Sequence, residues 1–331
     1  MKMRWFWGVL FSWCLILNQA MAAEQAKTLP IEMGFSAGLG FDSNVSSNPM
    51  QINDESAQLK YGTGDFFYEH NANIGYTLPV TSDFGVKAQY FVNQNFHFRL
   101  TRFDILSHNI SLIPKLRLFN NSGELVGLCN FNYLDIGSDK YRTFFTFIPT
   151  YFQMLTEKLM LETSLGYERR YYYAPIQTCH DDASAHNYTA GIGVYYFTNP
   201  ERTAYLQMRF GYEGNAAFGN NWDYQAFRLL TAAAFPIVQK LRARIYLDLT
   251  YQWFSANWFD AHKSANPIYV ATHPPFPKRQ DEIVAAGAQF FYDIRKDLAL
   301  QANMDVVRDS SNIFWYAYDR YVFSLFLNYH Y

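Results

Sequence analysis

Charged side chains that could act on a solute are concentrated in the later part of the sequence. Arginine binds carboxylates and phosphates well because its guanidinium group donates paired hydrogen bonds. Arginines lying among acids therefore either form structural ion pairs or guide an anionic solute or polymer along a wall. Both interpretations are open from the sequence. The candidate residues are Arg209, Glu213, Arg228, Arg242, Arg244, Asp248 and Asp305.

A polar segment contains residue types that bind metals. Its sequence is CHDDASAH, with Cys179, His180, Asp181, Asp182 and His186. The spacing matches no zinc pattern, and polar residues are expected in a connection between strands. We therefore expect no metal site and no cofactor.

Two serine–histidine combinations could be considered for a lipid hydrolase. Ser107 and His108 are neighbours in a predicted strand, and strand neighbours point to opposite faces. Ser324 and His330 are separated by about 20 Å along a strand. Neither combination forms a dyad by itself, so we expect a protein that is not an enzyme.

The elements that position these residues alternate in polarity with a period of two, which is typical of β-strands. In 241–254, for example, Ile245, Leu247 and Leu249 share one face, whereas Arg244 and Asp248 share the other. The pattern predicts about fourteen strands, with twelve or sixteen as alternatives. The predicted ranges are 31–42, 66–78, 85–95, 104–118, 124–135, 141–154, 159–172, 185–197, 203–213, 223–235, 241–254, 280–293, 298–308 and 317–331.

The connections between these strands alternate in length. The tight ones are 79–83, 120–123, 156–158, 198–202, 236–240 and 294–297, and the notable long ones are 43–65, 173–184, 214–222 and 255–279. Short periplasmic turns alternating with longer external loops indicate an outer-membrane barrel. Aromatic residues near both strand ends, such as Phe66 and Tyr76, are expected in the interfacial girdles. We predict an all-β fold, a transmembrane antiparallel up-and-down β-barrel.

Residues 1–22 are typical of a secretory signal peptide. Lys2 and Arg4 precede an apolar run over 5–17, and a small-x-small site ends at Ala22. The run is too short for a spanning helix. We expect cleavage near Ala22 and Ala23, which leaves 23–331 as one barrel domain in the outer membrane of a Gram-negative bacterium.

The composition agrees with a barrel in lipid. Aromatic residues make up 19% of the chain, yet the mean hydropathy is only −0.19. Alternating strands average to such a value, whereas spanning helices do not. The formal net charge of −2 gives no indication of nucleic-acid binding.

Four segments carry a resemblance to a known family. They are GLGFDSNVSSNP (38–49), YTAGIGVYYF (188–197), NNWDYQAFRLLTAAAFPI (220–237) and RDSSNIFWYAYDRYVFSLFLNYHY (308–331). These resemble the C-terminal barrels of the surface lipoprotein assembly modifier family and related barrels of exopolysaccharide loci. The resemblance implies a fourteen-stranded barrel that moves or displays a macromolecule at the cell surface. The positions it singles out are Asp42, Ser43, Asn44, Asn312, Tyr318, Asp319 and Arg320.

The expected function is passage or export of a polysaccharide, solute or surface protein across the outer membrane. The sequence lacks the family's tetratricopeptide repeats, so we expect a separate periplasmic export partner. One alternative is a structural or adhesive barrel that acts through the loops 43–65 and 255–279. A weaker alternative is an outer-membrane lipid hydrolase.

The last stretch, 316–331, alternates up to the terminal residue. Its apolar face ends in Tyr329 and Tyr331, which resembles the terminal aromatic signal that the barrel-assembly machinery recognises. We predict that this strand pairs with the first to close the sheet. Outer-membrane lipid and the assembly machinery are therefore expected partners.

Overall fold

The computed structural model describes residues 31–45, 64–173, 182–257, 278–313 and 316–331. The predicted signal peptide, 1–22, lies outside these ranges. The described residues form fourteen strands and two short 3-10 helices. The elements are β1 (Ile31–Asp42), β2 (Asp65–Pro79), β3 (Phe84–His97), η1 (Thr101–Phe103), β4 (Ile105–Leu118), β5 (Gly123–Ile136), β6 (Asp139–Met154), β7 (Leu159–Tyr172), β8 (Ala185–Phe197), β9 (Tyr205–Ala217), η3 (Asn220–Trp222), β10 (Tyr224–Val238), β11 (Leu241–Asn257), β12 (Lys278–Arg295), β13 (Leu298–Ser311) and β14 (Tyr318–His330).

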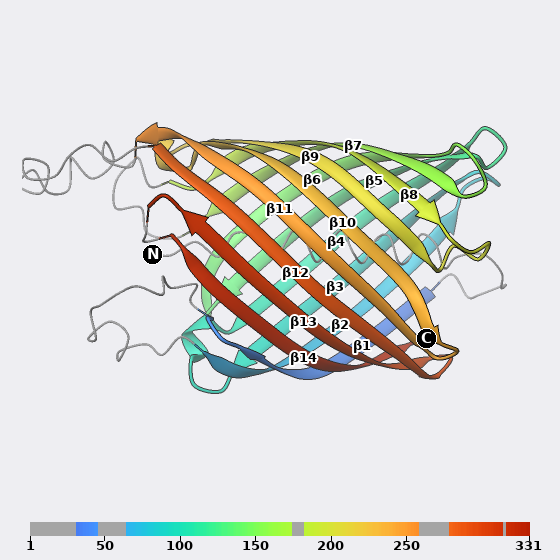
Figure 1. Cartoon of the computed structure of the whole chain (residues 1–331), viewed down its shortest axis with the longest axis horizontal. Helices are drawn as coiled ribbons and strands as arrows, with labels where there is room; N and C mark the ends of the chain where they lie inside the picture. The colour runs from blue at the N-terminus through green and yellow to red at the C-terminus, as the bar shows by residue number, and fades with distance from the viewer. Residues whose placement is uncertain (1–30, 46–63, 174–181, 258–277, 314–315) are drawn as a thin grey trace, which may run out of the picture.

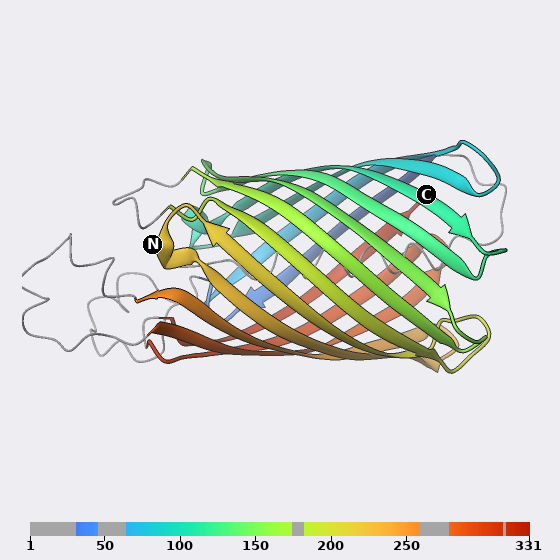
Figure 2. The same ribbon diagram turned by 90° about the horizontal axis from the view of Figure 1, so that it is seen from above.

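The strands form one closed antiparallel barrel. Each strand pairs with the strands before and after it in the chain, and β1 pairs with β14 to close the sheet. The strands are strongly tilted against the long axis (Figure 1 and Figure 2). In the closing pair, Phe35 lies opposite Tyr329 and Phe41 opposite Phe323. The predicted up-and-down barrel is confirmed with fourteen strands, so the alternatives of twelve and sixteen are wrong.

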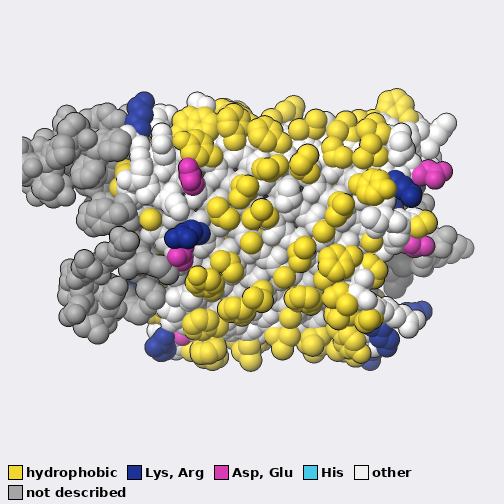
Figure 3. Space-filling model, in the orientation of Figure 1, with side chains coloured by type: hydrophobic (Ala, Val, Ile, Leu, Met, Phe, Trp, Pro, Cys, Tyr) yellow, Lys and Arg dark blue, Asp and Glu magenta, His cyan; other side chains and the backbone are white. Residues whose placement is uncertain are grey.

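The outer surface is apolar and the inner surface is polar, as the alternating pattern predicts. On β7, Leu165 is 65% exposed, whereas Glu162 and Ser164 point inward and are buried. Hydrophobic side chains cover the middle of the visible face, and charged side chains gather toward its two ends (Figure 3). An apolar band between polar ends is the surface of a barrel that spans a membrane.

No helix in the described part of the chain is long and apolar enough to cross a membrane.

The two ends of the barrel differ in their connections. The turn end carries 80–83, 119–122, 155–158, 198–204, 239–240 and 296–297, together with the terminal Tyr331. The loop end carries 43–64, 98–104, 137–138, 173–184, 218–223, 258–277 and 312–317. Turns of outer-membrane barrels face the periplasm and loops face outward.

Two connections at the loop end are shorter than their neighbours. The link between β5 and β6 is a two-residue hairpin in which Gly137 has φ 62° and Ser138 has φ 71°, as hairpins with a twisted strand pair require. The predicted connection 214–222 is wrong at its start, because β9 continues to Ala217 and stays paired with β8. In the remaining loop the Asp223 carboxylate accepts the Ala217 N–H at 2.5 Å, and burial raises the pKa of Asp223.

Candidate functional site

The inner face of the barrel divides into a neutral half and a charged half. Strands β13, β14 and β1 to β5 carry mainly amide and hydroxyl side chains in the middle of the strands, whereas the inward charges of the other half come from β6, β7, β9, β10 and β11. We call the neutral set the amide wall. It consists of Ser36, Asn71, Asn93, Ser107, Asn109, Ser111, Asn130, Asn132, Gln301, Asn303, Ser324 and Asn328. We call the charged set the charged wall. It consists of Arg142, Glu162, Glu168, Arg170, Arg209, Glu213, Arg228, Arg244 and Asp248.

Hydrogen bonds link the amide wall from strand to strand. Asn71 on β2 donates to Ser36 Oγ on β1 at 3.0 Å. Asn132 on β5 donates to Ser107 Oγ at 2.9 Å and to Asn109 Oδ1 at 2.8 Å, both on β4. Each of these side chains can both donate and accept hydrogen bonds. The wall therefore presents both hydrogen-bond donors and hydrogen-bond acceptors to a molecule in the lumen.

The amide wall continues across the seam of the barrel. Asn328 on β14 donates to Gln301 Oε1 on β13 at 3.0 Å. Gln301 donates to Asn303 at 2.8 Å, and Asn303 donates to Ser324 Oγ at 3.1 Å. Ser36 on β1 lies directly opposite Asn328 on β14, so neutral side chains of the wall lie on both sides of the seam.

Charges on the same strands are held in place by partners. Glu69 accepts hydrogen bonds from Asn71 at 3.1 Å and from Asn93 at 2.9 Å. Glu32 pairs with Lys87 at 2.7 Å, near the turn end. The middle of this half therefore presents mostly neutral groups.

The arginines singled out from the sequence each have a polar partner. Arg228 Nε lies 2.8 and 2.9 Å from the two Asp248 carboxylate oxygens. Arg244 donates to Gln289 Oε1 at 3.2 Å. Arg242 lies at the exposed turn end, where it pairs with Asp293 at 3.1 Å. The contacts of Arg228 and Arg242 are ion pairs, whereas the contact of Arg244 is a hydrogen bond to a neutral amide.

Arg209 reaches its partner across an intervening strand. Its Nε lies 3.1 Å from Glu162 Oε1 on β7, although β8 lies between β7 and β9. Glu162, Gly193 and Arg209 form one row across the three strands. The contact passes over a glycine, and a Cβ on Gly193 would lie 3.3 Å from Glu162 Oε2. The missing side chain therefore allows an ion pair between strands that do not hydrogen-bond to each other.

Asp305 on β13 is held by a hydrogen bond that also passes over a glycine. It accepts the Tyr246 hydroxyl at 2.5 Å, and Tyr246, Gly287 and Asp305 form one row across β11, β12 and β13. A Cβ on Gly287 would overlap both Asp305 Oδ1 and the Tyr246 ring. The sequence placed Asp305 among the lumen candidates but did not reveal this partner.

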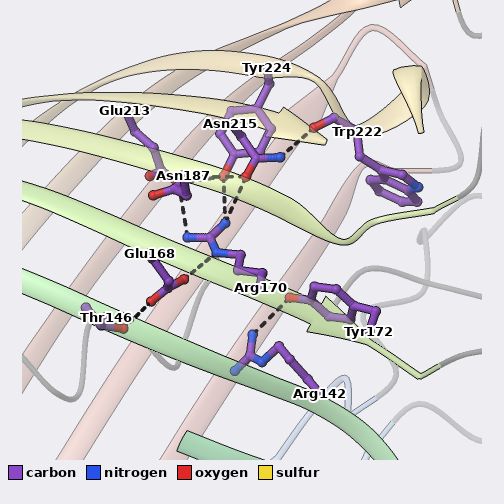
Figure 4. Close-up of polar contacts among 10 residues, drawn as sticks. All are labelled: Arg142, Thr146, Glu168, Arg170, Tyr172, Asn187, Glu213, Asn215, Trp222 and Tyr224. Atoms are coloured by element: carbon purple, nitrogen blue, oxygen red, sulfur yellow. Dashed lines mark hydrogen bonds and ion pairs between the residues drawn. The ribbon is translucent and has the colours of Figure 1, made fainter. Parts of the chain in front are cut away.

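The largest polar cluster surrounds Arg170 toward the loop end (Figure 4). Arg170 pairs with Glu168 on its own strand and, at 3.5 Å, with Glu213 on β9. Its Nη1 donates to Asn215 Oδ1 at 3.3 Å and to the Tyr224 hydroxyl at 3.4 Å. The Tyr224 hydroxyl in turn donates to Glu213 at 2.6 Å.

This cluster ties together five strands. Thr146 on β6 donates to Glu168 at 2.8 Å, and Asn187 on β8 donates to Glu213 at 2.6 Å. Glu213, one of the candidates predicted from the sequence, is therefore a partner of Arg170, and the sequence did not reveal this pairing. Because every charge in the cluster is hydrogen-bonded, it stiffens this wall and presents little free charge.

The serine–histidine combinations do not form dyads. Ser107 faces the lumen in the amide wall, whereas His108 faces outward and shares a hydrogen bond of 2.8 Å with the Tyr90 hydroxyl. Ser324 Oγ accepts from Asn303. Of the polar segment 179–186, only Asp182 and later residues are described, and no cluster of three metal-binding side chains occurs among the described residues.

The positions carried by the family resemblance gather at the loop end of the seam. Arg320 pairs with Asp42, and Ser43 Oγ accepts the Tyr321 N–H at 2.8 Å. Asn312 is bound to the start of β12, where its Oδ1 accepts the Gln280 N–H at 2.8 Å. The predicted assembly residues Tyr329 and Tyr331 lie at the turn end, on the outer face.

Comparisons with known proteins identify the fold. No protein-family model matches the sequence, and no curated protein matches it. The outer membrane channel DcaP of Acinetobacter baumannii is similar in structure, with a TM-score of 0.52, 9% identity, and coverage of 91% of this chain and 97% of that chain. The barrel shares its fold with an outer-membrane channel.

Two further solved structures have lower scores. A bacterial polysaccharide outer membrane secretin has a TM-score of 0.48 and 7% identity, covering 93% of this chain and 100% of that chain. OccAB2 of Acinetobacter baumannii has a TM-score of 0.46 and 8% identity, covering 93% of this chain and 99% of that chain.

Proposed function

We propose that the chain is an outer-membrane barrel that passes a hydrophilic substrate, and that this substrate is a polyhydroxylated chain, an oligosaccharide or polysaccharide. The observation that carries the proposal is the amide wall. A sugar hydroxyl both donates and accepts hydrogen bonds, and so do the asparagine and serine side chains of that wall. In the charged wall Arg209 and Arg228 are paired with Glu162 and Asp248, which reduces the positive charge that the wall offers to an anion.

The size of the barrel supports passage of a chain molecule. Fourteen strands spaced about 4.8 Å apart and tilted by about 40° enclose a backbone cylinder about 28 Å across. Barrels of eight strands are filled by their own side chains, whereas those of 16 to 18 strands leave an aqueous channel. A fourteen-stranded wall with long side chains therefore leaves a lumen narrower than that of a large porin.

The family resemblance also favours a polysaccharide as the substrate. Barrels of exopolysaccharide loci are among those that the sequence resembles, and in that setting a periplasmic export partner would deliver the polymer to the turn end. The alternative of an adhesive barrel depends on 43–65 and 255–279, most of which lie outside the described residues.

Liposome swelling with uncharged sugars of increasing length tests the proposal. We expect the reconstituted full chain to admit sugar oligomers. The double variant Asn93→Leu and Asn109→Leu, which removes two amides of the wall, should slow sugar uptake several-fold. The matched control is Arg228→Leu with Asp248→Leu, which removes one ion pair from the opposite wall and should leave sugar uptake near that of the parent chain.

Two results would contradict the proposal. One is a folded parent barrel that admits no sugar and is also silent in planar bilayers, both before and after neutralisation of Arg242 and Arg244. The other is equal sugar uptake in the amide and charged-wall variants. Heat-dependent gel mobility should be checked for each variant, so that a misfolded barrel is not counted as a closed one.

A further inference from the structure

A cation lies on the lipid-facing side of the barrel near the loop end. Arg169 is part of the outward row of β7, whereas its neighbours Glu168 and Arg170 face the lumen. A charged side chain on the lipid face of a barrel is costly at the bilayer midplane and becomes tolerable near the interface. Arg169 stands close to the end of β7 at Tyr172, which places it at the level of the outer headgroups.

Two aromatic rings lie close to the Arg169 guanidinium group. Its Cζ lies 4.5 Å from the ring centroid of Tyr171 and 4.3 Å from that of Phe218. Both rings are about half exposed on the outer surface. A cation–π contact of this kind leaves the N–H edge of a guanidinium group able to donate hydrogen bonds.

That N–H edge has no protein partner within the described residues. The Arg169 Nη1 atom is buried and forms no hydrogen bond, and no carboxylate in the described ranges forms an ion pair with the Arg169 side chain. His186 lies directly opposite Arg169 on β8. The His186 Nδ1 shares a hydrogen bond of 2.9 Å with the Tyr167 hydroxyl, which orients the ring.

The surroundings of this cation are apolar and aromatic. Tyr188 is 53% exposed and packs against Tyr167 with ring centroids 5.5 Å apart, and His186 lies edge-on to Phe218 at 6.1 Å. We call Tyr167, Arg169, Tyr171, His186, Tyr188 and Phe218 the Arg169 site. It combines an uncompensated positive charge with a surface suited to acyl chains and sugar rings.

We propose that the Arg169 site binds a phosphate group of lipopolysaccharide in the outer leaflet. This inference rests on the outer-membrane location that the proposed function includes, but not on what passes through the lumen. Guanidinium binds phosphate through paired, charge-assisted hydrogen bonds. Lipopolysaccharide is the lipid whose phosphates, sugars and acyl chains occur together at the loop end of an outer-membrane barrel.

Another outward arginine at the same end provides a matched control. Arg308 on β13 also faces outward, but it lies 3.6 Å from the Asp319 carboxylate and is 71% exposed. Its charge is therefore compensated and screened by solvent. Loss of Arg308 should affect a bound anionic lipid much less than loss of Arg169.

Native mass spectrometry of the full chain with bis-phosphorylated lipid A tests the site. We expect the parent chain to retain this lipid about fivefold more strongly than Arg169→Gln, since one basic side chain near a charged surface contributes that order of affinity. Arg169→Lys should restore part of the difference. Arg308→Gln should behave like the parent chain.

Two lipid comparisons complete the experiment. Dephosphorylated lipid A should bind the parent chain and Arg169→Gln equally, because the phosphate is then missing. Phosphatidylglycerol should show a smaller difference between these two proteins than lipid A does. Equal retention of lipid A by the parent chain and Arg169→Gln would overturn the proposal, and so would an equal effect of Arg308→Gln. Sugar uptake measured on Arg169→Gln keeps this result separate from the lumen function, which should be unchanged.

Discussion

Arg320 on β14 donates from Nε to both carboxylate oxygens of Asp42 on β1, at 3.0 Å each, and its Nη2 contacts the same carboxylate. The two residues lie 278 positions apart in the chain. Asp42 is buried and its Oδ1 also accepts the Asn44 N–H at 2.9 Å, while the Asn44 side chain donates to the Asp319 carbonyl at 3.0 Å. The first and last strands are thus clasped at the loop end, at the one pairing that closes the sheet.

Removing the carboxylate from this clasp should destabilise the barrel. Asp42→Ala removes the carboxylate that Arg320 binds across the seam, and we expect the free energy of unfolding to fall by about 3 kcal/mol, the lower end of the range for a buried pair. Part of the Arg320 side chain remains exposed, which limits the loss. Urea unfolding in lipid vesicles measures this loss in the free energy of unfolding. Asp319→Ala is the control, because its pair with Arg308 is exposed and should be worth less than about 1 kcal/mol; equal losses would contradict the role of the clasp.

The glycine rows make a second prediction. In Gly287→Ala the new methyl group would overlap Asp305 and Tyr246, so their hydrogen bond must break or the strands must shift. We expect a loss of about 1 to 3 kcal/mol, as for an overpacked site. Gly211→Ala is the matched control, since its Cβ would lie 3.7 Å or more from its neighbours and should change stability by less than about 0.5 kcal/mol. The same unfolding measurement compares the two variants, and equal stability of Gly287→Ala and Gly211→Ala would argue against the close contact.

Neighbouring positions on β4 test which face meets lipid. Ile110 is 56% exposed on the outer face, and Asn109 belongs to the amide wall. Ile110→Arg should cost about 2 to 4 kcal/mol, as expected for arginine near the bilayer midplane. Asn109→Arg places the same charge in a polar lumen and should cost much less while changing ion selectivity. If the two variants lose equal stability in vesicles, the assignment of the faces is wrong.

Much of the fold could be predicted because one physical signal repeats along the chain. Lipid selects apolar side chains on every second position and water selects polar ones between them, so the strand 241–254 was recognisable before its partners were known. The end of this strand at Asn257 could not be recognised from the sequence pattern. Strand ends depend on pairing with neighbours, as in β9, where pairing with Ala185 carries the strand on to Ala217.

The candidate site was predictable only as a set of inward residues. Parity places Arg209 and Glu162 on the inner face, but their contact depends on the register of three strands and on Gly193 between them. The amide wall was not predicted because the candidates were chosen by charge, and asparagine side chains are neutral. A count of inward amides per strand would have found it, since they concentrate on β2 to β5.

The end of the chain gives the last prediction. Tyr331 exchanges two backbone hydrogen bonds with Met33, at 3.1 and 2.8 Å, and Tyr329 lies between Phe35 on β1 and Leu298 on β13. Deletion of 329–331 removes these pairings and the terminal aromatic residues together, so the truncated chain should fail to insert into the membrane. Fractionation of a Gram-negative host and heat-dependent gel mobility measure insertion. Tyr331→Phe keeps an aromatic residue at the end and should insert normally, whereas normal insertion of the truncated chain would refute an assembly role for this strand end.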